Sequence, residues 1–269
     1  LVCNIAIGAS TVPTQRVLGN LFYRGLRFHR PVFIGDTLTT RTKVVALRQN
    51  SVKPGREASG MVGLEIHTVN QNGKTVLHFW RCPMVPCKDP GANTGLDNDL
   101  DIMPEVISDA DILRSVPKWD LSALPVEETS FELGDVIDVE ARDTITMAPE
   151  LVRMTLNMAM THTDVTRSVY SKRLVYGGHT ISIAAAQLAR VLPSLAMILC
   201  WYKCEHVAPA FEGDILASRI HVQEVIGLAN GRLLKLAIEV FAERVNDAGE
   251  TESDIRVLNW QLGVLARPN

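Results

Sequence analysis

Apolar residues recur at spacings of three and four between residues 177 and 192, in a stretch that begins with a glycine pair and is followed by Pro193. This spacing predicts an α-helix, and because its other sides are almost as apolar, we expect other elements to surround it. Gly177 and Gly178 have no Cβ, so a backbone or a ligand can approach the first turn, whose free N–H groups suit an anion. The glycines can equally serve only a tight turn into the helix.

A sequence pattern that occurs twice organises most of the chain. Residues 31–44 (PVFIGDTLTTRTKV) match residues 209–222 (PAFEGDILASRIHV) at seven of fourteen positions, at an offset of 178 residues. Each copy has a Gly-Asp turn followed by a predicted strand, over residues 37–47 and 215–225. Such repetition predicts two copies of one structural unit.

Two further strands are predicted in each copy. Period-two alternation predicts second strands at residues 63–69 and 234–241, and polar turns follow both of them. Third strands are predicted at residues 76–80 and 257–260. We therefore expect two antiparallel meanders that pack side by side as one long antiparallel sheet, with both apolar helices against its concave side.

The repeat also predicts how the chain is divided. We expect a first unit over residues 1–85, a Pro-, Gly- and Asp-rich linker over 86–128 and a second unit over 129–269. At the offset of 178, Leu1 falls opposite His179, so we expect the chain to open inside the first unit's helix. The counterpart of His162 would then precede residue 1, and candidate chemistry is sought in the second unit.

Two shorter helices are predicted. One lies in the linker at residues 104–115, where apolar side chains could cover a surface. These side chains belong to Val106, Ile107, Ile112 and Leu113. The other begins near Pro149 and runs to about residue 160, after a turn and strand at residues 131–146.

Composition narrows the function classes. The chain has 269 residues, 46% of them hydrophobic, and a net charge of −3 with scattered basic residues, so neither nucleic acid nor an anionic membrane is expected as a partner. Five cysteines beside apolar runs disfavour a disulfide framework and favour a cytoplasmic protein, and no signal peptide is visible. Cys200, Cys204 and His206 lack a fourth ligand at a zinc-site spacing, so no metal and no cofactor are predicted.

Several motifs resemble one enzyme family. The segments EARDTIT (residues 140–146), RLVYGGHTI (173–181), CEH followed by AFEGD (204–214) and NLFYRGLRF (20–28) resemble the MaoC-like, or R-specific enoyl-CoA hydratase, superfamily. They are most similar to its β-methylmalyl-CoA dehydratase, or mesaconyl-CoA hydratase, branch. The resemblance implies an α+β double hot dog fold and reversible hydration of a short-chain dicarboxylyl-CoA thioester by a hydro-lyase. The paired fold already supplies the contact that single units obtain by dimerising, so a homodimer or higher homo-oligomer is optional.

The superfamily motif Asp-x-Asn-Pro-x-His is only partly present. In NMAMTH the histidine is kept as His162, but Asn157 stands where the motif has its aspartate. The resemblance makes His162 the acid/base, while Asn157 can position water but cannot accept its proton, so Asp164 takes the second role or that role is lost. Read from the residues alone, His162 can also merely end the preceding helix.

The remaining candidates would bind the substrate. The motif glycine is Gly178, whose N–H would stabilise negative charge on the thioester oxygen, with Gly177 beside it. His179 follows the pair and either contacts the ligand or faces solvent.

A cation for the substrate's free carboxylate is sought in the basic loop. Arg173 is the first choice and Arg167 the second, unless the loop is merely solvated or meets the phosphates of CoA. On the strand that enters the second meander, Glu205 and His206 are expected to face water.

Two other functions remain open. The hot dog fold also occurs in acyl-CoA thioesterases, and the missing aspartate weakens the hydratase hypothesis against them. The third possibility is a protein that binds acyl thioesters without turnover.

Overall fold

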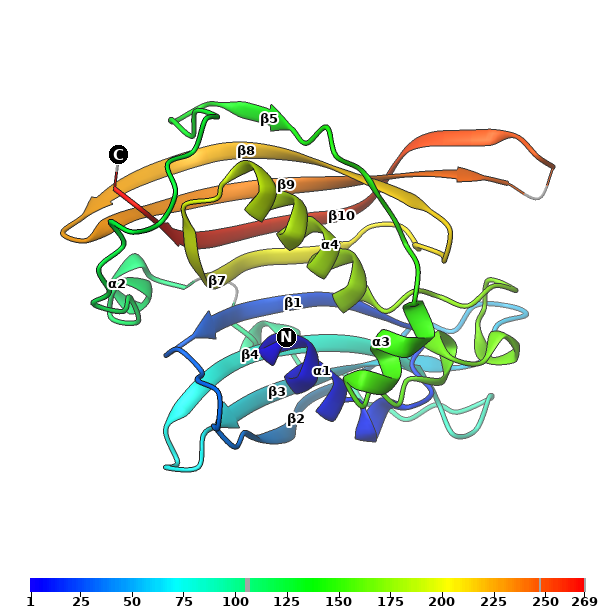
Figure 1. The fold of residues 1–269 in the computed structure, drawn as a ribbon. Coiled ribbons are helices and arrows are strands. Elements are labelled where there is room, and N and C mark those ends of the chain that lie inside the picture. The colour runs from blue at the N-terminus through cyan, green and yellow to red at the C-terminus, as the bar shows by residue number, and fades with distance from the viewer. Residues whose placement is uncertain (105–106, 247, 269) are drawn as a thin grey trace.

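A computed structural model describes residues 1–104, 107–246 and 248–268. Within these ranges, ten strands form one antiparallel sheet in the order β2-β3-β4-β1-β7-β10-β9-β8-β5, with β6 also paired to β8 (Figure 1). The strands are β1 Gly19–Phe28, β2 Thr39–Gln49, β3 Ser59–Val69, β4 Thr75–Pro86, β5 Val136–Asp138, β6 Asp143–Thr144, β7 Leu195–His206, β8 Ile215–Leu228, β9 Gly231–Val245 and β10 Thr251–Ala266. The predicted long antiparallel sheet is confirmed.

The two halves of the sheet meet at β1 and β7 and are related by an approximate twofold axis. Tyr23 lies opposite Cys204, and Leu26 lies opposite Trp201. By the offset of 178 residues, Tyr23 is equivalent to Trp201, and Leu26 is equivalent to Cys204. Tyr23 therefore faces the equivalent of Leu26, and Leu26 faces the equivalent of Tyr23, as a twofold axis requires. As predicted, β2 and β8 occupy equivalent places, each three strands away from this junction.

The two Gly-Asp turns share one local geometry. Their glycines, at positions 35 and 213, have left-handed φ angles of 99° and 94°. Each aspartate accepts a hydrogen bond at 2.9 Å from the amide of the phenylalanine three residues before it. The repeated sequence therefore specifies a repeated turn, because a glycine tolerates the positive φ and the aspartate caps the exposed amide.

Two apolar helices cover the same face of the sheet. Figure 1 shows α1 (Val2–Ala9) in front of the first half and α4 (Gly177–Val191) in front of the second. Ala184 and Leu188 of α4 have no exposed surface, which confirms the predicted central helix. The helices touch where Asn4 Nδ2 donates a hydrogen bond to Ser182 Oγ at 2.8 Å. None of the helices in the described part of the chain is long and apolar enough to span a membrane.

The helix predicted from Pro149 to about residue 160 is wrong in its second half. It is α3, Ala148–Met154, and it ends because Leu156 adopts a left-handed φ of 55°. The amides of residues 156 and 157 bond to the carbonyls of residues 153 and 152, at 3.1 and 3.0 Å, which is a Schellman ending. No glycine occurs at this position to signal the ending. Short 3-10 helices lie at η1 Val12–Thr14, η2 Leu100–Ile102, η3 Met160–His162 and η4 Val165–Arg167.

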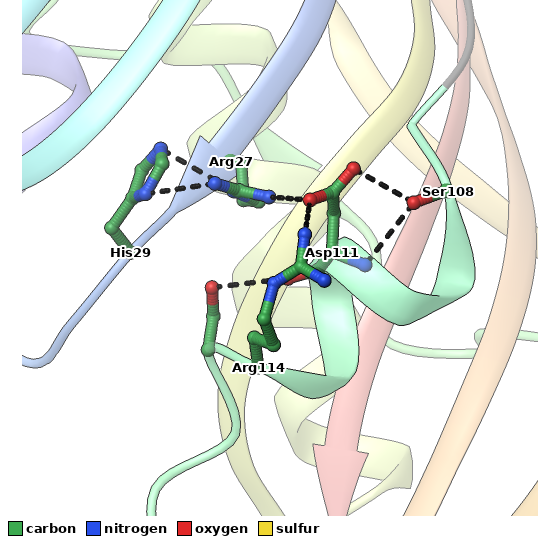
Figure 2. Close-up of polar contacts among 6 residues, drawn as sticks. Arg27, His29, Ser108, Asp111 and Arg114 are labelled. Atoms are coloured by element: carbon green, nitrogen blue, oxygen red, sulfur yellow. Dashed lines mark hydrogen bonds and ion pairs between the residues drawn. The ribbon is translucent and has the colours of Figure 1, made fainter.

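The linker contains α2, Asp109–Leu113, inside the range predicted for a short helix. Figure 2 shows the Asp111 carboxylate between Ser108 and two arginines. It accepts from Ser108 Oγ at 2.7 Å, lies 3.1 Å from Arg27 Nη1 of β1 and pairs with Arg114, so α2 is tied to the first half of the sheet. Ile112 is fully buried, whereas Leu113 is 39% exposed. Val106 lies outside the described residues, and the division of the chain at residues 85 and 129 stays a prediction.

Candidate active site

A cavity of about 240 Å³ lies where the N-terminus of α4 meets β1, β4, the end of β7 and the segment after α3. Both halves of the chain line it. Its polar side chains include Tyr23, Arg81, Asn157, His162, Tyr176 and His206. No aspartate or glutamate of the described ranges lines this cavity. Of the titratable side chains that line it, only the two histidines have an ordinary pKa near neutral pH, so they are the natural acid/base groups.

His162 is held in one orientation by the loop that leads to α4. Its Nδ1 lies 2.7 Å from the carbonyl oxygen of Leu174, which can only accept, so the proton is on Nδ1 and Nε2 has a free lone pair. Burial lowers the pKa of His162 to about 4, although the Leu174 carbonyl acts in the opposite direction. The ring is therefore neutral near pH 7 and can act as a base.

Asn157 lies in the turn that ends α3 and is buried, with 8% of its surface exposed. Its Oδ1 accepts from the Ala159 amide at 2.9 Å, which fixes the side-chain amide. The next amide, of Met158, donates to Thr11 Oγ1 at 2.8 Å and anchors this turn to the first half of the chain. No hydrogen bond joins Asn157 Nδ2 to another described residue, so Nδ2 remains a donor for a ligand or a water in the cavity.

The two glycines of α4 face different neighbours. A Cβ at Gly177 would lie 2.3 Å from His206 Nε2, so only glycine allows this ring so close to the first turn of α4. A Cβ at Gly178 would lie 2.4 Å from Asn4 Oδ1 and 2.5 Å from Tyr176 Cζ, which places Gly178 against α1. Gly177 lines the cavity and Gly178 does not. Neither amide donates to another described residue, and the oxyanion role of Gly178 stays a prediction.

His206 was expected to face water, and that expectation is wrong. It lies on the same face of β7 as the buried Cys204, whereas Lys203 and Glu205 form an ion pair at 3.1 Å on the opposite face. His206 Nε2 is buried without a partner among the described residues. Burial, and then the nearby His162, lower the pKa of His206 to about 4. The period-two alternation with Cys204 was the signal that could have found it.

Asp164 is not the partner of His162. It is exposed and caps η4, where its Oδ1 accepts from Thr166 N at 2.9 Å and from Thr166 Oγ1 at 2.7 Å. Its other oxygen lies 4.0 Å from Arg167 Nε. The sequence prediction failed because a local turn satisfies this carboxylate, two residues after the histidine.

Three predicted substrate-binding residues, Arg167, Arg173 and His179, lie outside the cavity lining. Arg167 pairs with Asp164, and Arg173 pairs with Glu212. His179 is half-buried, and burial lowers its pKa although Glu212 partly opposes this. None of these three side chains lines the cavity. Cys200 and Cys204 are free thiols, and no group of three metal-ligating side chains occurs in the described ranges.

The sequence analysis missed the arginine of the cavity. Arg81 of β4 is 3% exposed and stands between Trp80 and Cys82, in a stretch (residues 79–86) that is otherwise apolar. It lies opposite Tyr23 of β1, whose ring centroid is 6.3 Å from that of His206. A single arginine within a run of core residues was the available signal.

Curated relatives of this chain act on CoA thioesters according to their names. It is 30% identical over 213 residues to the mesaconyl-CoA hydratase of Cereibacter sphaeroides, and the match covers 76% of this chain and 61% of that protein. It is 32% identical over 238 residues to the β-methylmalyl-CoA dehydratase of Chloroflexus aurantiacus, and the match covers 80% of this chain and 63% of that protein. The chain thus spans about three-fifths of the length of these relatives. No family model matches it.

Solved structures share the fold over the whole chain. A conserved hypothetical protein of Mycobacterium tuberculosis with a double hot dog fold is 41% identical with a TM-score of 0.86, covering 98% of this chain and 80% of that one. A putative MaoC domain protein dehydratase from Chloroflexus aurantiacus is 26% identical with a TM-score of 0.75, covering 100% and 81%. With its ten-stranded sheet, two wrapped helices and these relatives, the chain belongs to the MaoC-like dehydratase family with a double hot dog fold.

Proposed function

We propose that this chain carries the active site of a hydro-lyase that reversibly hydrates a short-chain dicarboxylyl-CoA thioester, converting mesaconyl-CoA to β-methylmalyl-CoA. The main support is His162, a neutral imidazole with a free Nε2, in the same buried cavity as the donor Asn157. The names of the two curated relatives support the substrate class. Assembly into a homodimer or larger homo-oligomer stays a prediction.

Hydration needs a base for water, a proton for the carbon beside the carbonyl, and stabilisation of negative charge on the thioester oxygen. Asn157 Nδ2 holds the water, and His162 Nε2 takes its proton as the oxygen bonds to the β-carbon. The free N–H group of Gly177, which lines the cavity at the positive end of α4, stabilises the enolate oxygen, whereas the predicted donor Gly178 lies outside the cavity lining.

The second proton comes from His206 in this proposal. The proton that His162 removed from water passes to His206 Nε2, and His206 gives it to the α-carbon, so both rings end neutral and the balance closes. The observation behind this role is the position of His206 Nε2, buried beside Gly177 and close enough to His162 to affect its own pKa.

A second candidate is an acyl-thioester-binding protein without turnover. It is favoured by Asn157, because an amide cannot accept the proton that the motif aspartate would take. A thioesterase that depends on a carboxylate finds none in the cavity lining of the described residues.

One assay separates these functions. The full-length protein is incubated with mesaconyl-CoA and with crotonyl-CoA, while enoyl absorbance and free thiol are followed separately. We expect loss of enoyl absorbance without thiol release. Thiol release indicates a thioesterase, and tight binding with neither change indicates a binding protein; both results contradict the proposal.

A further inference from the structure

Arg81 is a buried cation whose hydrogen bonds are only partly used. Its Nε donates to Ser10 Oγ at 2.9 Å, and its Nη2 donates to Ser10 O at 2.7 Å and to Thr14 Oγ1 at 3.0 Å. No hydrogen bond joins Nη1 to another described residue. Arg81 lines the cavity, so the two donors of Nη1 remain for a ligand there.

No carboxylate of the described residues compensates this charge. Arg81 has no ion pair in the described ranges, and the groups that act on its pKa, which burial lowers, are Tyr23, Tyr176 and Cys82. An unpaired charge in a protein interior is costly, and such charges are usually paired. Arg81 donates to neutral oxygens instead, so the described residues provide no counter-ion for its positive charge.

The fold itself does not require an arginine at this position. In the first half of the sheet Arg81 lies opposite Tyr23, and in the second half Leu262 lies opposite Trp201, the twofold equivalent of Tyr23. Leu262 is fully buried in the core. The equivalent position is therefore filled by an apolar side chain, and a local packing role does not account for the charge of Arg81.

Arg81 lies in the same cavity as the acid/base groups, as a ligand with a negative charge close to the reacting carbons would require. Arg81 and Tyr23 are on neighbouring strands, and Tyr23 in turn lies beside His206, with ring centroids 6.3 Å apart. No hydrogen bond joins the Tyr23 hydroxyl to another described residue. In an enoyl-CoA whose double bond joins the thioester carbonyl to a carboxylate, the carboxylate is attached directly to the carbon that receives water. A cation that binds it must therefore share one cavity with the acid/base groups.

We propose that Arg81, through Nη1 and assisted by the Tyr23 hydroxyl, binds the free carboxylate of the acyl group and so selects dicarboxylyl-CoA over monocarboxylyl-CoA thioesters. The inference rests on the proposed function for the position of the acyl group. It replaces Arg173 and Arg167, which lie outside the cavity and are paired with Glu212 and Asp164. Because Nε and Nη2 are already bonded, Nη1 binds the carboxylate alone and not as part of a two-nitrogen fork.

Binding of saturated thioesters tests this role without turnover. Succinyl-CoA and butyryl-CoA have the same chain length and differ by the terminal carboxylate, and neither can be hydrated. We expect calorimetry on the full-length protein to give a preference for succinyl-CoA of about 10- to 100-fold, the range of one charge-assisted hydrogen bond. In Arg81→Leu this preference should vanish while butyryl-CoA binds within about threefold of the parent.

Two further variants keep the test decisive. Arg81→Lys retains the charge but not the hydrogen bonds of the guanidinium, so it should keep only part of the preference for succinyl-CoA. This variant supplies the test if Arg81→Leu does not fold. The matched control is Arg219→Leu, which removes an exposed arginine paired with Asp138 and should keep the full preference.

The proposal is overturned if the parent has no preference, if Arg81→Leu keeps it, or if Arg81→Leu weakens both thioesters equally, as loss of a CoA phosphate contact would. A parent that prefers succinyl-CoA but hydrates no enoyl-CoA contradicts the proposed function and not the role of Arg81.

Discussion

A methyl group added at Gly177 should displace His206 while leaving the fold intact. The new Cβ would lie 2.3 Å from His206 Nε2 and 2.6 Å from Cε1, where ordinary contacts are about 3.5 Å or more, so the ring must move by roughly 1 Å. A displacement of this size in a reacting group costs about 10²-fold in rate, or roughly 2.7 kcal/mol. Because Gly177 begins α4 and alanine favours helix, the stability should change by less than about 1 kcal/mol.

The assay for Gly177→Ala is kcat/KM with mesaconyl-CoA, measured beside the thermal midpoint of the full-length protein. Gly227→Ala is the control, because a Cβ at Gly227 meets no atom within 4 Å and its strand β8 lies away from the cavity lining. We expect Gly227→Ala to match the parent. Parent-like activity in a folded Gly177→Ala protein would show that the position of His206 does not matter for the reaction.

Three other changes test separate parts of the structure. Gly8→Ala puts a Cβ 1.8 Å from the Thr155 carbonyl oxygen, so urea unfolding should show a loss of about 1–3 kcal/mol, and an unchanged midpoint would contradict this packing. The folded pKa values of His162 and His206, about 4, lie below the ordinary value, so the unfolded chain binds more protons below about pH 6.5. The unfolding free energy should then fall from pH 7 to pH 5 by about 2 kcal/mol for each ring, less steeply in His162→Gln, and an equal slope in both proteins would refute this. Asn157→Asp restores the motif carboxylate and should raise kcat about tenfold or more; no rise in a folded variant would mean that a base at this position is not limiting.

Much of the fold could be predicted because turns, strands and apolar helices have recognisable residue patterns within short segments. The Gly-Asp turns recur at a fixed offset, and each strand follows its turn with the expected alternation. The small-residue helix from Gly177 was also visible, since residues apolar on every side must be surrounded. Each of these features depends on residues within one segment, so it can be recognised without knowing which segments pack together.

The site was harder to predict because its members come from distant segments. Asn157 and His162 were found by their motif, but the end of α3 depends on a left-handed Leu156 that no glycine announced. Asp164 was chosen for its proximity in sequence, and a local turn uses its carboxylate instead. Arg81 enters the cavity only because β4 pairs with β1 beside the junction of the two halves, which is a tertiary fact.

The most direct test of the hydration site follows oxygen from labelled water. The full-length protein is incubated with mesaconyl-CoA in H₂¹⁸O, beside the His162→Gln variant, and the products are examined by mass spectrometry with a parallel measurement of free thiol. The account predicts label in a hydroxyl on the β-carbon of an intact CoA thioester, and none in His162→Gln, although that variant still binds succinyl-CoA. Label in the carboxylate of a released acid, or full labelling of the hydroxyl by His162→Gln, would contradict it.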